Sequence, residues 1–114
     1  MDRPTDRPTD RPQAEQSRNK LRWKRLTAES LHAFERAVES DPYHADAHVY
    51  LAKTMAELDE YAAARASYKA AYALQPLSVA VMNGMGIVNA QEGRMSEAAQ
   101  LFAMAVQLAR DRHV

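Results

Sequence analysis

The chain has 114 residues, no cysteine, and 15 basic residues against 15 acidic ones. This length is enough for one small domain with a modest core, and the lack of cysteine excludes disulfides and thiolate metal sites. No stretch approaches the roughly 20 consecutive apolar residues of a membrane span, and the N-terminus lacks the apolar core of a secretory signal. These features favour a cytoplasmic protein.

Residues 2–12 repeat the tetrapeptide Asp-Arg-Pro-Thr. A proline at every fourth position removes backbone hydrogen-bond donors and blocks a helix. No apolar side chain follows Met1 in this stretch, so nothing is available to be buried. The composition predicts a disordered arm over residues 1–12.

A basic segment follows at 13–25, and charge is uneven as a result. Residues 1–26 carry eight Lys or Arg against four Asp or Glu, whereas residues 27–114 carry seven against eleven. We interpret 13–25 as a helical extension of the next helix. Alternatively, the segment grips phosphates or an anionic surface while its tryptophan stacks on a base. The residues of this alternative site are Arg18, Lys20, Arg22, Trp23, Lys24 and Arg25.

Helical spacing of apolar residues predicts five helical stretches. The first, over 27–40, is expected to begin at Thr27 as its N-cap and to end before Pro42. The others are expected at about 45–58, 62–74, 79–92 and 96–110. Ser78 and Ser96 are predicted N-caps, and Gly93 is predicted to take a left-handed turn conformation.

The stretch from Asp41 to Arg110 contains two copies of one sequence unit, with a period of 34 residues. Large residues pair with large and small with small at this spacing, which is the length of a helix–turn–helix solenoid unit. The matched pairs are Leu51/Met85, Ala52/Gly86, Tyr61/Met95, Ala64/Ala98, Tyr68/Phe102, Ala71/Ala105 and Leu74/Leu108. One further period back, a half unit carries Phe34, Ala37, Val38 and Pro42 in the same register.

This pattern resembles the tetratricopeptide repeat, which places large, small and proline residues at fixed unit positions. Two positions depart from the family, since His48 replaces a tryptophan and Asn89 replaces an aromatic residue. The resemblance implies an all-α fold, a short right-handed stack of helical hairpins over residues 26–110. It divides the chain into a half repeat at 26–44, full repeats at 45–78 and 79–110, and a tail at 111–114.

The resemblance also implies a concave groove lined by the first helix of each unit. There, Tyr50 would be a rigid aromatic anchor, and Asn83 and Gln91 would pair with a peptide backbone. Gly84 has no evident packing role and predicts a notch for a partner. Alternatively, the apolar members pack on a neighbouring helix. The predicted groove residues are Asp46, Val49, Tyr50, Lys53, Glu57, Asn83, Gly84, Ile87 and Gln91. The lysine and asparagine pattern of the carboxylate-clamp variant is not matched.

No nucleophile or phosphate-loop motif is present, and His44 and His48 lack a third ligand at a recognisable distance. We therefore predict no enzyme activity, no metal and no cofactor. The expected function is a non-catalytic adaptor, scaffold or small chaperone for a protein or peptide partner, with a regulatory fragment of a larger enzyme as a further alternative. Because no sealing helix is expected after the last unit, its end face is predicted to pair with another copy or another protein. That face comprises Leu101, Met104, Val106 and Leu108.

Overall fold

The structure is a computed structural model that describes residues 13–112, and this part of the chain is entirely α-helical apart from its turns. The predicted all-α class is therefore confirmed. The predicted arm at 1–12 and the last two residues of the predicted tail lie outside the described range. The helices are α1 (Gln13–Ser40), α2 (Ala45–Glu57), α3 (Tyr61–Leu74), α4 (Val79–Gln91) and α5 (Met95–Asp111).

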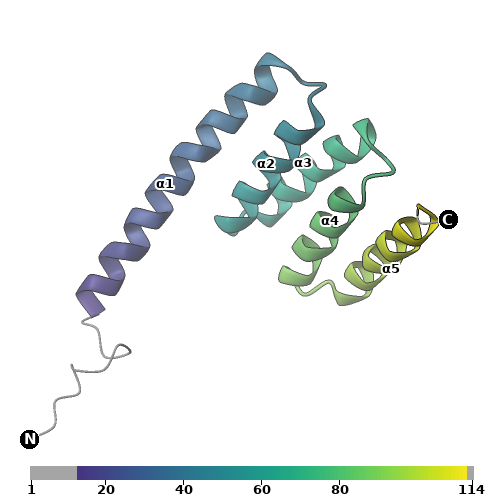
Figure 1. Cartoon of the computed structure of the whole chain (residues 1–114). Coiled ribbons are helices and arrows are strands. Elements are labelled where there is room, and N and C mark those ends of the chain that lie inside the picture. Colours follow the sequence, from purple (N-terminus) through teal and green to yellow (C-terminus); the bar gives the residue numbers. More distant parts are fainter. Residues whose placement is uncertain (1–12, 113–114) are drawn as a thin grey trace, which may run out of the picture.

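The helices form a short stack of antiparallel hairpins (Figure 1). Helices α2 and α3 make one hairpin, and α4 and α5 make the next. Helix α3 packs against α4 and joins the two hairpins, while α1 packs against α2 at the other side of the stack. None of the described helices is long and apolar enough to cross a membrane.

Small residues at the contacts let the helices approach closely. Ala52, Ala64 and Ala71 have no exposed surface, and the ring of Tyr68 fills the space that they leave. The core cluster consists of Ala52, Ala64, Tyr68, Ala71, Val81 and Val88. Ala52, Ala64, Tyr68 and Ala71 are positions of the repeat pattern, whereas Val81 and Val88 are core residues that the pattern does not mark.

Helix α1 is longer than its repeat unit requires. The expected start of a helix at Thr27 is wrong, because the helix is continuous from Gln13 to Ser40. No proline or glycine interrupts these residues. Thr27 lies in the interior of α1, where its Oγ1 is buried and donates to the carbonyl of Trp23 at 2.9 Å. The interpretation of 13–25 as a helical extension is confirmed.

Side chains cap two of the helix N-termini. The Nδ1 of His44 accepts from the amide of Ala47 at 3.0 Å, and the Oγ of Ser78 accepts from the amide of Val81 at 3.3 Å. The predicted Ser78 cap is confirmed. The predicted Ser96 cap is wrong, because α5 begins one residue earlier and Arg94 precedes it without a side-chain cap.

Two residues in turns adopt left-handed backbone conformations. Gly93 closes α4 with φ of 85°, as predicted, and Asp59 takes φ of 62° in the turn after α2. The Oδ1 of Asp59 accepts a hydrogen bond from the hydroxyl of Tyr61 at 2.9 Å. This bond holds the start of α3 against the tight turn, where a non-glycine residue is otherwise strained.

Candidate functional site

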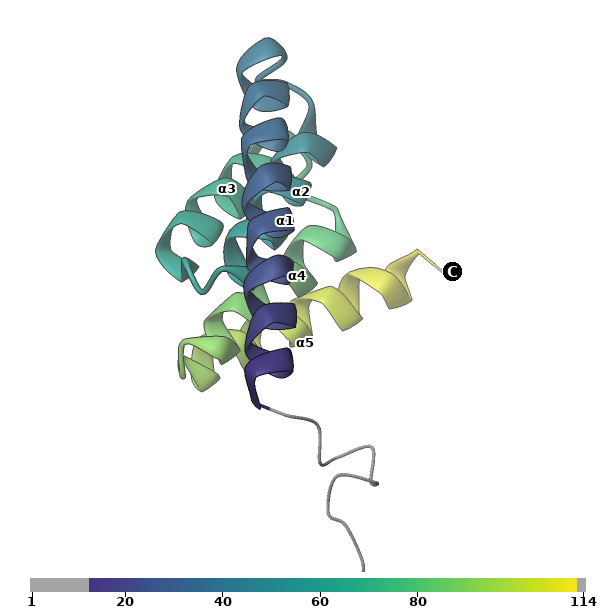
Figure 2. The same cartoon turned by 90° about the vertical axis from the view of Figure 1, so that its left-hand side faces the viewer.

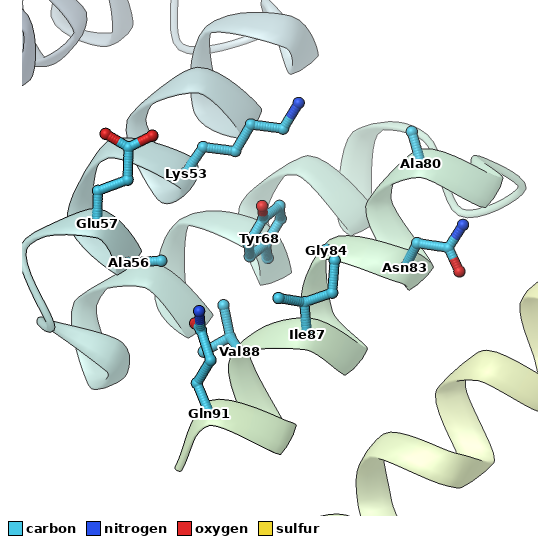
Figure 3. A pocket seen from close by; sticks show the side chains of 10 residues that line it. All are labelled: Lys53, Ala56, Glu57, Tyr68, Ala80, Asn83, Gly84, Ile87, Val88 and Gln91. Atoms are coloured by element: carbon cyan, nitrogen blue, oxygen red, sulfur yellow. The ribbon is translucent and has the colours of Figure 1, made fainter. Parts of the chain in front are cut away.

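A pocket of about 370 Å³ lies between α2 and α4, with α3 beneath it (Figure 3). Its lining includes six of the nine predicted groove residues. The lining residues are Lys53, Ala56, Glu57, Tyr68, Ala80, Asn83, Gly84, Ile87, Val88 and Gln91. The pocket is therefore formed by faces of α2 and α4 that are 34 residues apart in the sequence, as the repeat predicts.

Tyr68 forms the floor of the pocket from α3, and it was not among the predicted site residues. Its side chain is almost completely buried at 3% exposure, yet its hydroxyl makes no hydrogen bond within the described part of the chain. Burial raises the pKa of this hydroxyl above its ordinary value, so the group stays protonated at neutral pH. The floor thus presents one neutral hydroxyl that can donate or accept in an apolar setting.

Gly84 lets this ring reach the pocket. A Cβ at position 84 would lie 2.4 Å from Cε1 and 2.7 Å from the hydroxyl oxygen of Tyr68. The expectation that Gly84 has no packing role is therefore wrong, because its missing side chain is the space that the tyrosine occupies. Gly86 has the corresponding relation to Phe102, whose Cε1 would lie 2.6 Å from an added Cβ.

The walls of the pocket combine one large apolar side chain with four polar ones. Ile87 is half-exposed and lies beside the hydroxyphenyl ring (Figure 3). Lys53 and Glu57 come from α2, and Asn83 and Gln91 come from α4 (Figure 3). None of these four makes a hydrogen bond or ion pair with another described residue. The donors and acceptors of Glu57, Asn83 and Gln91 are free to meet a ligand, whereas the ammonium of Lys53 lies over the ring of Tyr50, 6.0 Å from its centroid.

The other three predicted groove residues lie outside the pocket. Tyr50 stacks on Phe34 of α1, with ring centroids 5.5 Å apart and an interplanar angle of 21°. Val49 packs against the core cluster, and Asp46 is exposed in the first turn of α2. Tyr50 thus packs on a neighbouring helix, which is the alternative that the sequence left open.

The predicted basic site lies on the N-terminal half of α1, which extends beyond the end of α2 (Figure 1). Trp23 is 58% exposed and Leu21 is 65% exposed, so neither covers the core. The helical period separates the five cations into two groups on different sides of the helix. Arg18, Arg22 and Arg25 form one group, and Lys20 and Lys24 form the other.

The model of the tetratricopeptide repeat matches residues 24–78 and 56–113, overlapping segments that together cover most of the chain. The chain belongs to the tetratricopeptide repeat family. No curated protein matches the sequence.

Solved structures of MamA resemble this repeat protein. One MamA crystal structure is 19% identical and has a TM-score of 0.72, over 77% of this chain and 52% of that one. MamA MSR-1 is 20% identical with a TM-score of 0.72, over 81% and 54% of the two chains. MamA AMB-1 is 22% identical with a TM-score of 0.70, over 75% and 47%. The repeat protein spans about half the length of these MamA chains, and at such identity the likeness establishes the fold alone.

His44 and His48, which are four residues apart, have structural roles in the repeat. His44 caps α2, and the Nε2 of His48 lies 2.8 Å from the carbonyl oxygen of Pro42. His48 is buried at the position where the family prefers tryptophan, and its ring ties α2 to the preceding turn. Among residues 13–112, no group of three or more His, Asp or Glu side chains is placed to hold a metal ion.

The sequence contains a signal for the role of Tyr68 in the pocket. The same unit position holds Phe34 in the half repeat and Phe102 in the last repeat. Phenylalanine therefore suffices for packing at this position, and the extra hydroxyl in the middle unit is the one that reaches the pocket. A difference between units at a core position can thus identify a residue of the site.

Proposed function

We propose that this tetratricopeptide repeat protein is a non-catalytic interaction module, an adaptor, scaffold or small chaperone, that binds a partner segment between α2 and α4. The observation that supports this is the pocket itself, an apolar hollow in which Glu57, Asn83 and Gln91 make no hydrogen bond or ion pair with another described residue. Pockets that combine an apolar floor with a few free polar groups are typical binding sites.

The floor and the rim would act on different parts of the ligand. An apolar side chain of the partner would be buried against Tyr68, Ile87 and Val88, at about 25 cal/mol for each Å² removed from water. Asn83 and Gln91 each carry both a donor and an acceptor, so they can pair with peptide groups beside that side chain. The buried hydroxyl of Tyr68 would add one hydrogen bond at the bottom of the pocket.

The charge of the lining argues against recognition of a free carboxylate tail. Lys53 is the only cation in the lining, and Glu57 stands one helical turn away on the same helix. A carboxylate would meet both charges, and the attraction would be largely cancelled. An internal segment without a terminal charge fits the pocket better, either as a helix or as an extended strand.

Substitution of Ile87 by glutamate tests the proposal. Ile87 is 50% exposed, so the change leaves the core intact while it places a charge in the pocket. Partners would be captured from lysate on the wild-type chain and identified, and their segments would then be titrated by calorimetry. We expect Ile87→Glu to weaken binding at least about tenfold, since an unpaired charge beside an apolar surface is costly.

A matched control comes from α5. Met95 is 64% exposed and does not line the pocket, so Met95→Glu adds the same charge to a similar apolar site. Binding by this variant should equal that of the wild type. Equal losses in the two variants, or no loss in Ile87→Glu, would show that partners bind elsewhere on the molecule.

A further inference from the structure

One side of α1 is exposed to solvent, whereas the equivalent sides of α3 and α5 are buried against another helix. Two small residues recur in each unit, and in the full units they are buried at 2% exposure or less, as in Ala64, Ala71, Ala98 and Ala105. Their equivalents in α1, Ser30 and Ala37, are both exposed. Among the described helices only α2 packs against α1, which runs along one side of the stack (Figure 2).

In the full units, the first helix of the hairpin packs along the second, α2 on α3 and α4 on α5. Helix α1 occupies the place of the second helix of its unit, and no described helix occupies the place of the first, because residues 13–25 continue α1 instead of folding back. The same molecule thus shows what covers this face when a unit is complete. It is an antiparallel helix.

The uncovered face carries a continuous row of residues, which we call the open stripe. Its members alternate in spacings of four and three, the spacing that faces a partner helix over several turns. All of them are exposed, and two are large and apolar. The open stripe consists of Asn19, Trp23, Leu26, Ser30, Ala33 and Ala37.

A hollow of about 170 Å³ opens beside the open stripe, between α1 and the end of α2. Trp23, Leu26 and Ser30 line it from α1, and Thr54 lines it from α2. The large members of the stripe thus border a recess. A side chain of a helix lying on the stripe can enter this recess and be buried between α1 and α2.

The charges along one edge of the stripe indicate the chemistry of the missing helix. Arg18, Arg22 and Arg25 follow one another on this edge, all exposed, and none forms an ion pair with another described residue. Farther along the same edge, Glu29 and Arg36 offset each other. Acidic side chains on the covering helix would pair with the three arginines and complement the field at this end.

We propose that the open stripe of α1 is a docking site for an amphipathic helix of a partner protein, with an apolar face and Asp or Glu along one flank. The docked helix would complete the half repeat as α2 and α4 complete the full ones. The open stripe lies on α1 and none of its residues lines the pocket that carries the proposed function, although the hollow beside the stripe shares Glu57 with that pocket; variants of the stripe therefore test it separately.

A helix is favoured over a nucleic acid by the arrangement of the cations. Phosphate binding gathers positive charge on one side of a helix, whereas Lys20 and Lys24 lie on the side opposite Arg18 and Arg22. The row of apolar and small residues between these groups offers stacking to a base only at Trp23. It offers a continuous contact to a helix.

The test uses designed helical peptides without tryptophan as probes. One peptide has leucine at its apolar face, glutamate on the flank that would lie beside the three arginines in an antiparallel helix and neutral residues on the other flank, and the control peptide has lysine in place of each glutamate. Trp23 is the only tryptophan of the chain, so its fluorescence reports directly on the open stripe. We expect the acidic peptide to bind with a blue shift of the emission, and the basic peptide to bind at least about tenfold more weakly.

Two double variants with equal charge changes locate the site. Arg18→Glu/Arg22→Glu reverses the edge of the stripe, and Lys20→Glu/Lys24→Glu makes the same change on the opposite side of α1. The first should lose the acidic peptide at least about tenfold, while the second should lose at most about threefold, through the general field alone. Equal losses would overturn the proposal.

Other outcomes also contradict it. Loss of the peptide in Ile87→Glu would place it in the pocket between α2 and α4, whereas unchanged binding in that variant separates this proposal from the proposed function. A blue shift that grows with protein concentration alone would make a second copy the occupant. No peptide binding, with tight and steeply salt-dependent binding of single-stranded oligonucleotide, would assign the face to nucleic acid.

Discussion

Replacement of Gly84 by alanine tests how the floor of the pocket is built. The new Cβ would lie 2.4 Å from Cε1, 2.5 Å from Cζ and 2.7 Å from the hydroxyl oxygen of Tyr68. Ordinary contacts begin near 3.4 Å, so the ring must move by about 1 Å. The ring is 3% exposed and belongs to the core cluster, which leaves little room for this movement.

Two opposing terms decide the sign of the effect. Overpacking of a well-packed core costs typically about 1–3 kcal/mol, whereas alanine gains about 1 kcal/mol over glycine in a helix interior. Because three ring atoms are involved and the ring is confined, we expect a net loss of about 1–2 kcal/mol in the free energy of unfolding. Gly86→Ala should cost less, since Phe102 is only half-buried and can move outward.

Urea unfolding followed by far-UV circular dichroism measures this difference, since the described chain is helical throughout. A second measurement in a Tyr68→Leu background isolates the contact, because leucine lacks the three ring atoms that the new Cβ meets. There, Gly84→Ala should stabilise the protein by up to about 1 kcal/mol through helix propensity alone. If Gly84→Ala left the stability unchanged or raised it with Tyr68 in place, the ring would be free to move and the reasoning would fail.

Three further changes have expected outcomes. Ser78→Ala should lower stability by about 1 kcal/mol in urea unfolding through loss of the α4 cap, whereas Ser96→Ala, which removes no cap, should have no measurable effect. Burial raises the pKa of Tyr68 above 10.0, so this hydroxyl loses its proton at lower pH in the unfolded chain than in the folded one. The free energy of unfolding should therefore decline above about pH 10, and it should decline less steeply in Tyr68→Phe. Glu92→Gln breaks the half-buried pair with Arg65, which joins α3 to the end of α4; we expect a loss of about 0.5–1 kcal/mol that shrinks at high salt.

The fold was predictable because its determinants repeat. Ala52 and Gly86, or Ala64 and Ala98, mark the places where helices touch, and each pair recurs at the same spacing. Because each unit has a small residue at the same helix–helix contact, few other packing arrangements fit the sequence. The sequence therefore contained several independent copies of the same structural constraint.

Helix ends were less predictable, because a cap works only if the preceding residue leaves the helix. Thr27 and Ser96 have suitable side chains, but no turn precedes Thr27 and the turn before α5 ends one residue early. Ser78 follows a proline-containing turn, which fixes where α4 begins. The predicted cap was confirmed only at Ser78, where the proline-containing turn ends α3 before the cap residue.

Some features of the candidate site could be predicted from the sequence, and others could not. Residues on the inner faces of α2 and α4, such as Lys53 and Ile87, were expected in a groove from the resemblance to the tetratricopeptide repeat, and both line the pocket. The relation of Gly84 to Tyr68 depends on how closely α3 approaches α4 in the next unit, and a pattern within one unit does not contain that distance. For the same reason, the repeat pattern within one unit does not contain the stacking of Tyr50 on Phe34 of α1.

The same argument explains why the two proposed surfaces differ in kind. A repeat pattern states which face of each helix must be covered, but not which chain covers it. Ala71 and Ala105 are buried by a helix of their own hairpin, and Ala37 occupies the equivalent position with none. The pocket lies between α2 and α4, which are already packed against neighbouring helices, so its ligand must fit the shape of the cavity. The open stripe of α1 is a face whose neighbour is absent, so its ligand must replace a helix.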